Sequence, residues 1–202
     1  MKMKLNQAAL LLAGLFVAAQ SPATPIFDDN FNAYNGGVGV LNFSTFGGNW
    51  TISNGTVDLI GNGYFDLHPG NGLYIDLDGS TGAAGKMVSK PIALGAGSYE
   101  LSFGLGGSRR NNDNEVSVSV DVGIASTSYT VLSAAPFVTQ TMVFTLLAPQ
   151  NINLVFKNAG GDNVGAILDN VKLNAVPDGG LTAGLLGMAF LGLAVCRRKA
   201  GQ

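Results

Sequence analysis

The clearest indication of the fold is the stretch at residues 115–122, which reads Glu115-Val116-Ser117-Val118-Ser119-Val120-Asp121-Val122. Every second residue is valine, and the residues between the valines are polar. Because successive side chains of a β-strand point to opposite faces of the sheet, this alternation predicts a strand with one buried side and one side in water. Such strands are typical of antiparallel sheets that cover a core with one face.

The same period of two recurs on both sides of this stretch. Apolar residues occupy every second position at residues 99–105, 142–146 and 152–156. Shorter strands are predicted at residues 41–46, 50–53, 56–60, 64–67, 73–77 and 164–173. Turns rich in Gly, Asn and Asp separate these segments, and no extended helical periodicity occurs between the two ends of the chain. Residues 24–175 are therefore expected to form an all-β domain, an antiparallel β-sandwich or jelly roll.

The composition excludes several classes of protein. The chain has 202 residues with one Cys and one His, so it can form neither an intrachain disulfide nor a Cys-rich or His-rich zinc site. Five of its 11 Lys and Arg residues (positions 2, 4, 197, 198 and 199) lie in the end segments, as does Asp178. The body keeps six basic and twelve acidic residues, a formal charge of −6. We therefore expect no nucleic-acid partner, whereas neutral glycans or calcium-bridged polymers are compatible with this charge.

The first 23 residues have the layout of a secretory signal peptide. Met1-Lys2-Met3-Lys4 is cationic, and residues 8–19 form an apolar run that is too short to span a bilayer comfortably. Small residues then suit cleavage by signal peptidase after either Ala19 or Ala23. The sequence thus predicts an N-terminal signal helix at residues 1–23, with a buried N-terminal helix of the domain as the alternative.

The other end of the chain predicts a membrane anchor. Residues 181–196 are uncharged and are followed at once by Arg197-Arg198-Lys199. A helix of this length reaches about 24 Å, and flanking residues together with local thinning of the bilayer compensate for the shortfall from about 30 Å. The basic cluster would stay on the cytoplasmic side, which leaves the body outside. A buried core helix is the alternative.

Just before this segment stands Val176-Pro177-Asp178-Gly179-Gly180, an extended and accessible stretch. This stretch, the apolar segment and the three cations together resemble a PEP-CTERM sorting tail in its Val-Pro-Asp-Ser-Gly variant, here over residues 176–202. Pro177 and Asp178 match the variant, and Gly179 stands where it usually has Ser. The resemblance implies a bacterial protein processed by an exosortase, a membrane protease or transpeptidase that removes the anchor. A plain stop-transfer anchor is the alternative.

A second resemblance concerns the body. Residues 74–80, 97–103 and 167–171 are similar to segments of galactose-binding-like jelly rolls, which occur in carbohydrate-binding modules and bacterial surface proteins. Jelly rolls of this type often hold one calcium ion where the first and last strands meet. The resemblance therefore implies a structural calcium site formed by Asp28, Asp29 and Asn30 with Asp169. Ordinary edge and turn positions are the alternative for these four residues.

Ligand-binding residues are expected in the polar loop that follows residues 99–105. Loops on rigid sandwiches are common binding sites, and Arg109, Arg110 and Asn112 can hydrogen-bond sugar hydroxyls. Trp50, Tyr64 and Tyr74 are the candidates to stack on a sugar ring, although Trp50, the only tryptophan, is expected in the core. A polar hairpin loop without a ligand is the alternative.

The body contains one candidate pair of catalytic residues. Asp76 and Asp78 are two residues apart and would share one face of a strand at about 7 Å, a separation that suits inverting glycoside hydrolysis. A solvated strand end is the alternative. The EF-hand interpretation of the same residues fails because Met87 occupies the position that needs a glutamate.

The sequence thus predicts an exported, non-catalytic protein of the cell surface, outer envelope or extracellular matrix. The first hypothesis for its activity is binding of carbohydrate or exopolysaccharide. A structural surface or biofilm component without a specific ligand is the second, and a glycoside-active enzyme that uses Asp76 or Asp78 is the third.

Overall fold

The computed structural model describes residues 24–177. The expected signal helix, the transmembrane helix at residues 181–196 and most of the sorting tail lie outside the described residues. Within the described part of the chain, no helix is long and apolar enough to cross a membrane.

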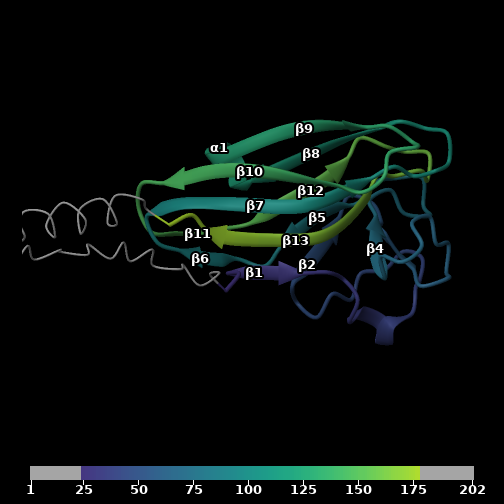
Figure 1. Cartoon of the computed structure of the whole chain (residues 1–202), viewed down its shortest axis with the longest axis horizontal. Coiled ribbons are helices and arrows are strands. Elements are labelled where there is room, and N and C mark those ends of the chain that lie inside the picture. Colours follow the sequence, from purple (N-terminus) through teal and green to yellow (C-terminus); the bar gives the residue numbers. More distant parts are fainter. Residues whose placement is uncertain (1–23, 178–202) are drawn as a thin grey trace, which may run out of the picture.

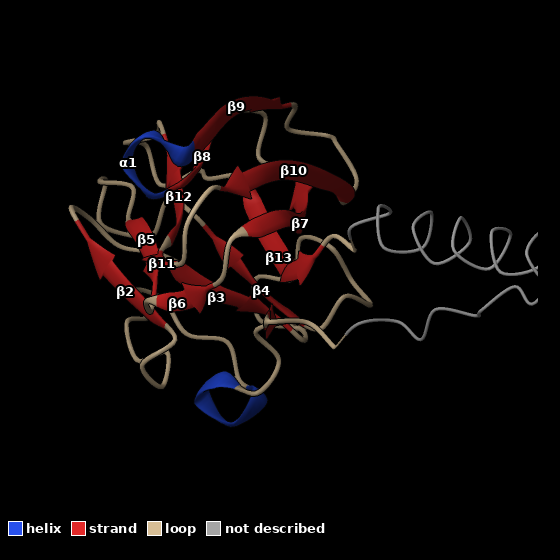
Figure 2. Cartoon of the chain, turned by 90° about the vertical axis from the view of Figure 1, so that its left-hand side faces the viewer, coloured by secondary structure: helices blue, strands red, loops and turns tan. Residues whose placement is uncertain are grey.

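The described residues form two antiparallel sheets that pack face to face, with one small additional pair of strands (Figures 1 and 2). The first sheet has the order β10-β7-β13-β4-β3, with β1 also paired to β13. Its strands are β1 (Phe27–Asp29), β3 (Asp58–Gly61), β4 (Leu73–Asp76), β7 (Gly97–Gly106), β10 (Val138–Leu146) and β13 (Ile167–Ala175).

The second sheet has the order β2-β5-β12-β8-β9. Its strands are β2 (Trp50–Ser53), β5 (Lys86–Ser89), β8 (Asn114–Val120), β9 (Ala125–Val131) and β12 (Leu154–Asn158). The additional pair is β6 (Ile92–Leu94) with β11 (Gln150–Ile152), and the two short helices are η1 (Tyr34–Gly37) and α1 (Asp121–Ile124). The expected all-β antiparallel sandwich is confirmed.

The core lies between the two sheets, as expected from the alternation of apolar and polar residues along the strands. Val116, Val118 and Val120 of β8 are fully buried, and β7 contributes Leu101 and Phe103 from the facing sheet. Burial of side chains of this size stabilises the fold by about 1.5–3 kcal/mol each. The strand predicted through residue 122 ends earlier, at Val120, because the short helix α1 follows and Gly123 adopts a φ of +98°.

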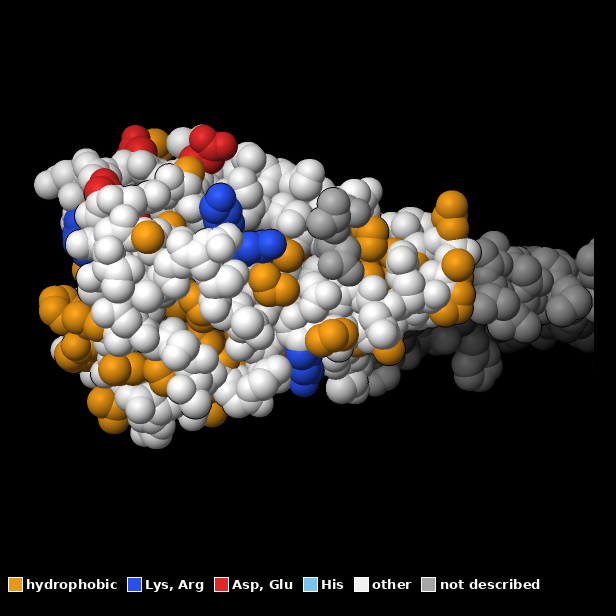
Figure 3. Space-filling model, turned by 180° about the vertical axis from the view of Figure 1, so that it is seen from behind, with side chains coloured by type: hydrophobic (Ala, Val, Ile, Leu, Met, Phe, Trp, Pro, Cys, Tyr) orange, Lys and Arg blue, Asp and Glu red, His pale blue; other side chains and the backbone are white. Residues whose placement is uncertain are grey.

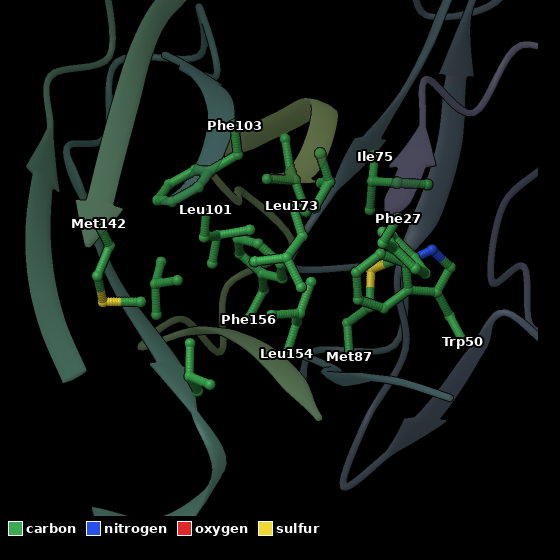
Figure 4. Close-up of a cluster of buried hydrophobic side chains, with 14 of the residues drawn as sticks. Phe27, Trp50, Ile75, Met87, Leu101, Phe103, Met142, Leu154, Phe156 and Leu173 are labelled. Atoms are coloured by element: carbon green, nitrogen blue, oxygen red, sulfur yellow. The ribbon is translucent and has the colours of Figure 1, made fainter. Parts of the chain in front are cut away.

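Aromatic rings fill the centre of the core (Figure 4). Trp50 is 3% exposed, as expected, and meets Phe27 and Phe156 edge to face at centroid distances of 5.3 and 5.9 Å. Phe103 meets Phe156 in the same manner at 5.2 Å. Edge-to-face pairs add about 0.5–1.5 kcal/mol beyond area burial. The ring cluster therefore joins β1 and β7 of the first sheet to β2 and β12 of the second.

Two predicted strands are absent, and the reason is local backbone geometry. Residues 41–46 and 64–67 are irregular apart from single bridges at Val40 and Tyr64. Asn42 and Phe65 have φ values of +54° and +44°, which are incompatible with an extended strand. The predictions for these two segments were wrong.

The strand register determines which residues gather at each end of the sandwich. The first strand β1 pairs antiparallel with the last strand β13, so that residues 24 and 177 lie at the same end (Figure 1). The opposite end, here called the loop end, carries the end of β4 and the segments that join β7 to β8 and β12 to β13. The ten residues of β7 separate the two ends by about 30 Å.

Candidate functional site

The loop end holds a group of buried carboxylates. Asp76 is the last residue of β4, and the antiparallel register places it directly opposite Asp58 of β3. The two residues are 1% and 5% exposed. Like charges directly opposite each other destabilise a sheet, so this pair requires compensating contacts.

Asp58 is compensated by neutral donors. One of its oxygens accepts the backbone N–H of Asn42 at 2.7 Å and that of Ser80 at 3.2 Å. The other accepts the Ser80 hydroxyl at 2.8 Å. These three hydrogen bonds supply partners to both oxygens of the buried carboxylate.

Asp76 is compensated by a cation. Its Oδ2 forms an ion pair with Nη2 of Arg110, and its Oδ1 accepts the backbone N–H groups of Asp78 and Gly165, each at 3.0 Å. The pKa of Asp76 is nevertheless raised to about 7, chiefly by burial and to a smaller extent by the charge of Asp58, against the lowering effect of the backbone donors and Arg110. Gly165 is required for this contact, because a Cβ there would lie 2.2 Å from Oδ1 of Asp76.

Asp78 faces away from this arrangement. It is fully buried, and its Oδ2 accepts the backbone N–H groups of Gly161 at 2.8 Å and Asp162 at 3.2 Å. Its Oδ1 has no hydrogen-bond partner among the described residues. Asp76 lines the hollow described below and Asp78 does not, so the arrangement does not favour the hypothesis that these two carboxylates act together in hydrolysis.

A small hollow of about 70 Å³ lies over Asp76, and we call it the Phe65 hollow. Its lining residues combine apolar side chains with charged and hydroxyl groups: Leu41, Asp58, Ile60, Phe65, Leu67, Asp76, Ser80 and Arg110. Figure 3 shows hydrophobic side chains exposed at the loop end of the domain, and others at the opposite end. The hollow thus offers an apolar wall beside a few polar groups, which is the usual composition of a small-molecule site.

Phe65 provides the aromatic ring among the residues that line this hollow. It is 61% exposed, although a phenylalanine of a stable sandwich is normally buried. Its ring is held edge to face against Tyr64 at 4.9 Å. An exposed, braced ring of this kind provides a flat apolar surface for the C–H face of a ligand ring.

The structure brings only some of the predicted ligand-binding residues to the hollow. Arg110 lines it, and Asn112 of the same loop donates to Asp162 at 2.6 Å and so links two loops. Arg109 lines a neighbouring hollow. Tyr74 is fully buried and its hydroxyl donates to Asp66 at 2.8 Å, so the prediction that Tyr74 stacks on a sugar was wrong.

Asp28 and Asn30 line one open hollow together with Asp29, and each also contacts another residue. Asp28 lies on the exposed side of β1, where its carboxylate is 3.6 Å from the ammonium group of Lys172. Asn30 is exposed and accepts the backbone N–H of Asn32. Within residues 24–177, no group of three or more His, Cys, Asp or Glu side chains is arranged to hold a metal ion.

The other two residues of that set lie together. Asp29 and Asp169 are 9% and 2% exposed, and the neighbouring charge of Asp29 contributes, after burial, to a pKa of about 7 for Asp169. Asp29 is already engaged, because it accepts the hydroxyl of Tyr34 at 2.5 Å and the indole N–H of Trp50 at 2.8 Å. Two adjacent buried carboxylates suit a hard cation such as calcium.

Comparisons with known proteins agree with the motif and the fold. Residues 175–200 match the family model described as the VPDSG-CTERM motif. The chain therefore carries a sorting motif, which supports an exported protein of the cell surface. A comparison with curated protein sequences gave no match.

Two solved structures share the fold of the body. One is the CBM22-1 xylan-binding domain from Paenibacillus barcinonensis, with 13% identity, a TM-score of 0.51 and coverage of 79% of this chain and 99% of that domain. The other contains the CBM22-1 and GH10 modules of endo-1,4-beta-D-xylanase 10B from Clostridium thermocellum, complexed with xylohexaose. Its identity is 13%, its TM-score is 0.51, and the alignment covers 76% of this chain but 29% of that protein. At such identities the likeness establishes a common fold.

Proposed function

We propose that this chain is an exported surface protein whose sandwich domain binds extracellular carbohydrate in the Phe65 hollow. The observation that carries the proposal is the position of an exposed ring, Phe65, beside the ion pair of Asp76 with Arg110. Sugar rings present an apolar C–H face and a rim of hydroxyl groups. Such a ligand can pack against Phe65 while its hydroxyls exchange hydrogen bonds with Arg110 and Ser80.

The fold supports this proposal in a second way. The domains that share it include one that binds xylan, so the sandwich is compatible with carbohydrate binding. The polymer itself is not specified by that likeness, since function resides in the site and not in the fold.

The proposed domain is non-catalytic. Hydrolysis needs two carboxyl groups on either side of a bound sugar linkage. Here Asp78 is turned beneath residues 161–162, and Asp58 is held by hydrogen bonds to Ser80 and Asn42. We assign to Asp76 the role of orienting Arg110, and a glycoside-active enzyme becomes the weaker alternative.

The route to the surface is part of the proposal. Signal peptidase would remove residues 1–23, and an exosortase would process the segment from Val176 onward while residues 181–196 hold the chain in the membrane. Intact mass spectrometry of the surface-associated protein tests both steps. A mass that includes residues 1–23, or everything past Asp178, would contradict the corresponding step.

The binding proposal is tested with a matched pair of variants. Phe65→Ala removes the exposed ring of the hollow, and Leu147→Ala removes a side chain that is 94% exposed at the opposite end. Affinity electrophoresis of the full chain against a panel of neutral and acidic polysaccharides should show retardation that Phe65→Ala weakens about tenfold or more.

The control variant should bind as the wild type does, and both variants should unfold at the wild-type denaturant midpoint. If no polymer retards the chain and the chain self-associates, the result would favour the alternative of a structural surface component without a specific ligand. Equal weakening by both variants would show that binding does not use the Phe65 hollow.

We also propose that one calcium ion can bind at Asp29 and Asp169, where the first and last strands meet. Such an ion would stabilise the sandwich by linking its two terminal strands. Asp28 and Asn30 line the hollow next to Asp29 and complete the proposed set of ligands.

A further inference from the structure

A second and larger hollow adjoins the Phe65 hollow, and Leu67 lines both. It is open, with a volume of about 550 Å³, and we call it the Arg109 hollow. Its lining residues include one cation and no carboxylate: Leu67, His68, Pro69, Asn71, Arg109, Pro136 and Phe137. Arg109 and Arg110 are consecutive, so that one short segment supplies a guanidinium group to each hollow.

The wall of the Arg109 hollow is built by tight packing. The rings of His68 and Phe137 lie 4.6 Å apart and cover Gly106 at the end of β7. A Cβ at Gly106 would lie 3.1 Å from Nε2 of His68 and 3.2 Å from Cδ1 of Phe137. The glycine thus allows both rings to lie against the strand.

Hydrogen bonding leaves acceptors on this wall. Nε2 of His68 donates to the carbonyl oxygen of Gly107 at 2.7 Å, because a carbonyl can only accept. In the neutral ring, Nδ1 is then the acceptor nitrogen. Asn71 donates its Nδ2 to the carbonyl oxygen of His68 at 2.8 Å, which leaves its Oδ1 as a second acceptor.

The charge of Arg109 is not compensated. Ion pairs within residues 24–177 join Arg110 to Asp76 and Lys172 to Asp28, and none involves Arg109. Its backbone is fixed by a 2.9 Å hydrogen bond from its N–H to the carbonyl oxygen of Ser133, whereas its side chain is exposed.

The carboxylates in the neighbouring segments are already engaged. Asp66 accepts the hydroxyl of Tyr74 at 2.8 Å and the N–H of Gly63 at 3.2 Å. Asp113 accepts the N–H of Ser133 at 2.8 Å. A domain whose net charge is negative therefore presents an uncompensated cation in a hollow that no carboxylate lines.

We infer that the Arg109 hollow binds the carboxylate of an acidic sugar, so that the ligand of this domain is a uronate-containing polysaccharide. This inference rests on the proposed function, because it places a second sugar residue next to the one in the Phe65 hollow. A guanidinium group binds a carboxylate through two parallel hydrogen bonds, and water-exposed pairs of this kind favour specificity more than affinity. Nδ1 of His68 and Oδ1 of Asn71 would accept hydroxyl groups of the same sugar.

The test compares two polymers that differ only in the carboxylate. Polygalacturonate and its carboxyl-reduced form have the same backbone, and their affinities for the full chain are measured in a detergent without sugar groups. We expect the wild type to prefer polygalacturonate by about five- to tenfold, and this preference should shrink as added salt screens the pair.

Arg109→Gln should abolish the preference without lowering affinity for the reduced polymer, and Arg109→Lys should retain part of it. Phe65→Ala should instead lower the affinity for both polymers by a similar factor. Equal affinity of the wild type for both polymers would overturn the inference and leave carbohydrate binding intact. Failure of the wild type to bind any polysaccharide would overturn the proposed function itself.

Dextran sulfate and dextran form the second arm of the experiment. If Arg109→Gln lowers affinity for dextran sulfate but leaves the preference for polygalacturonate unchanged, the site recognises sulfate and the assignment to a carboxylate is wrong. No effect of Arg109→Gln on dextran sulfate supports the assignment to a uronate.

Discussion

The stability of the domain should fall as the pH rises from about 4 to about 7. Burial, with a nearby carboxylate as a further cause, raises the pKa of both Asp76 and Asp169 from 3.8 to about 7. Between these pH values the unfolded chain has lost both protons while the native state still holds them. Because stability falls with pH wherever the native state binds more protons, the contribution is complete below pH 4 and is lost as the pH rises through about 7.

The magnitude follows from the number of protons. One proton held only by the native state changes the free energy of unfolding by about 1.4 kcal/mol per pH unit. Asp76 and Asp169 together give a slope of up to about −3 kcal/mol per pH unit at pH 5–6. Asp76→Asn removes one of the two protons and should halve this slope, and its amide oxygen can still accept the N–H groups of Asp78 and Gly165.

The assay is urea unfolding followed by the fluorescence of Trp50, the only tryptophan, which lies in the core. Free energies are measured in EDTA at several pH values between about 4.5 and 6.5. Glu115→Gln, on the exposed side of β8, is the control variant. It shows how much the loss of a carboxylate at an exposed position changes the dependence of the unfolding free energy on pH. A slope for Asp76→Asn equal to that of the wild type, or a wild-type stability that increases with pH, would refute the reasoning.

Three further predictions concern packing and the terminal strands. Gly107→Ala should lower the free energy of unfolding in urea by about 3 kcal/mol, because the new Cβ would lie 2.2 Å from the carbonyl oxygen of Ser133. Gly161→Ala is the control, because its Cβ would meet nothing closer than 3.7 Å. Trp50→Phe should cost about 1–3 kcal/mol in urea unfolding followed by circular dichroism, because it removes the indole hydrogen bond to a buried carboxylate, and a loss below about 0.5 kcal/mol would contradict this role. Calcium should raise the thermal midpoint of the wild type relative to EDTA but not that of Asp169→Asn, and equal shifts in both would exclude the proposed ion.

The strands that the sequence predicts are those that bury one face. Alternation in β7 and β8 marks buried positions directly, and both strands lie where expected. In contrast, β9 reads Ala-Ser-Thr-Ser-Tyr-Thr-Val and is exposed along most of its length, so that no hydrophobic period reveals it. It is a strand because all seven of its residues pair with β8. Such pairing depends on the tertiary structure and cannot be predicted from the local sequence pattern.

The sequence identified two charged residues of the site but neither their contact nor the exposed aromatic ring. Arg110 and Asp76 were each candidates, for different roles, and the structure joins them across 34 residues of sequence. Phe65 was missed because residues 64–67 resemble a strand, in which its ring would alternate with buried neighbours. The adjacent Asn62-Gly63, a common turn sequence, was the signal that this aromatic residue lies on a loop at the surface.

The junction between domain and tail explains how sorting and binding can coexist. The N–H of Val176 still donates to the carbonyl oxygen of Ser98 at 2.8 Å, so the sheet extends into the first residue of the motif. Pro177 has no N–H to continue this pairing, and the sorting motif therefore begins where the sheet must end. Because β13 runs from the loop end to this junction, the Phe65 and Arg109 hollows lie about 30 Å from the tail. A processing enzyme at the tail and a polysaccharide in the hollows would thus contact opposite ends of the domain, and neither needs to displace the other.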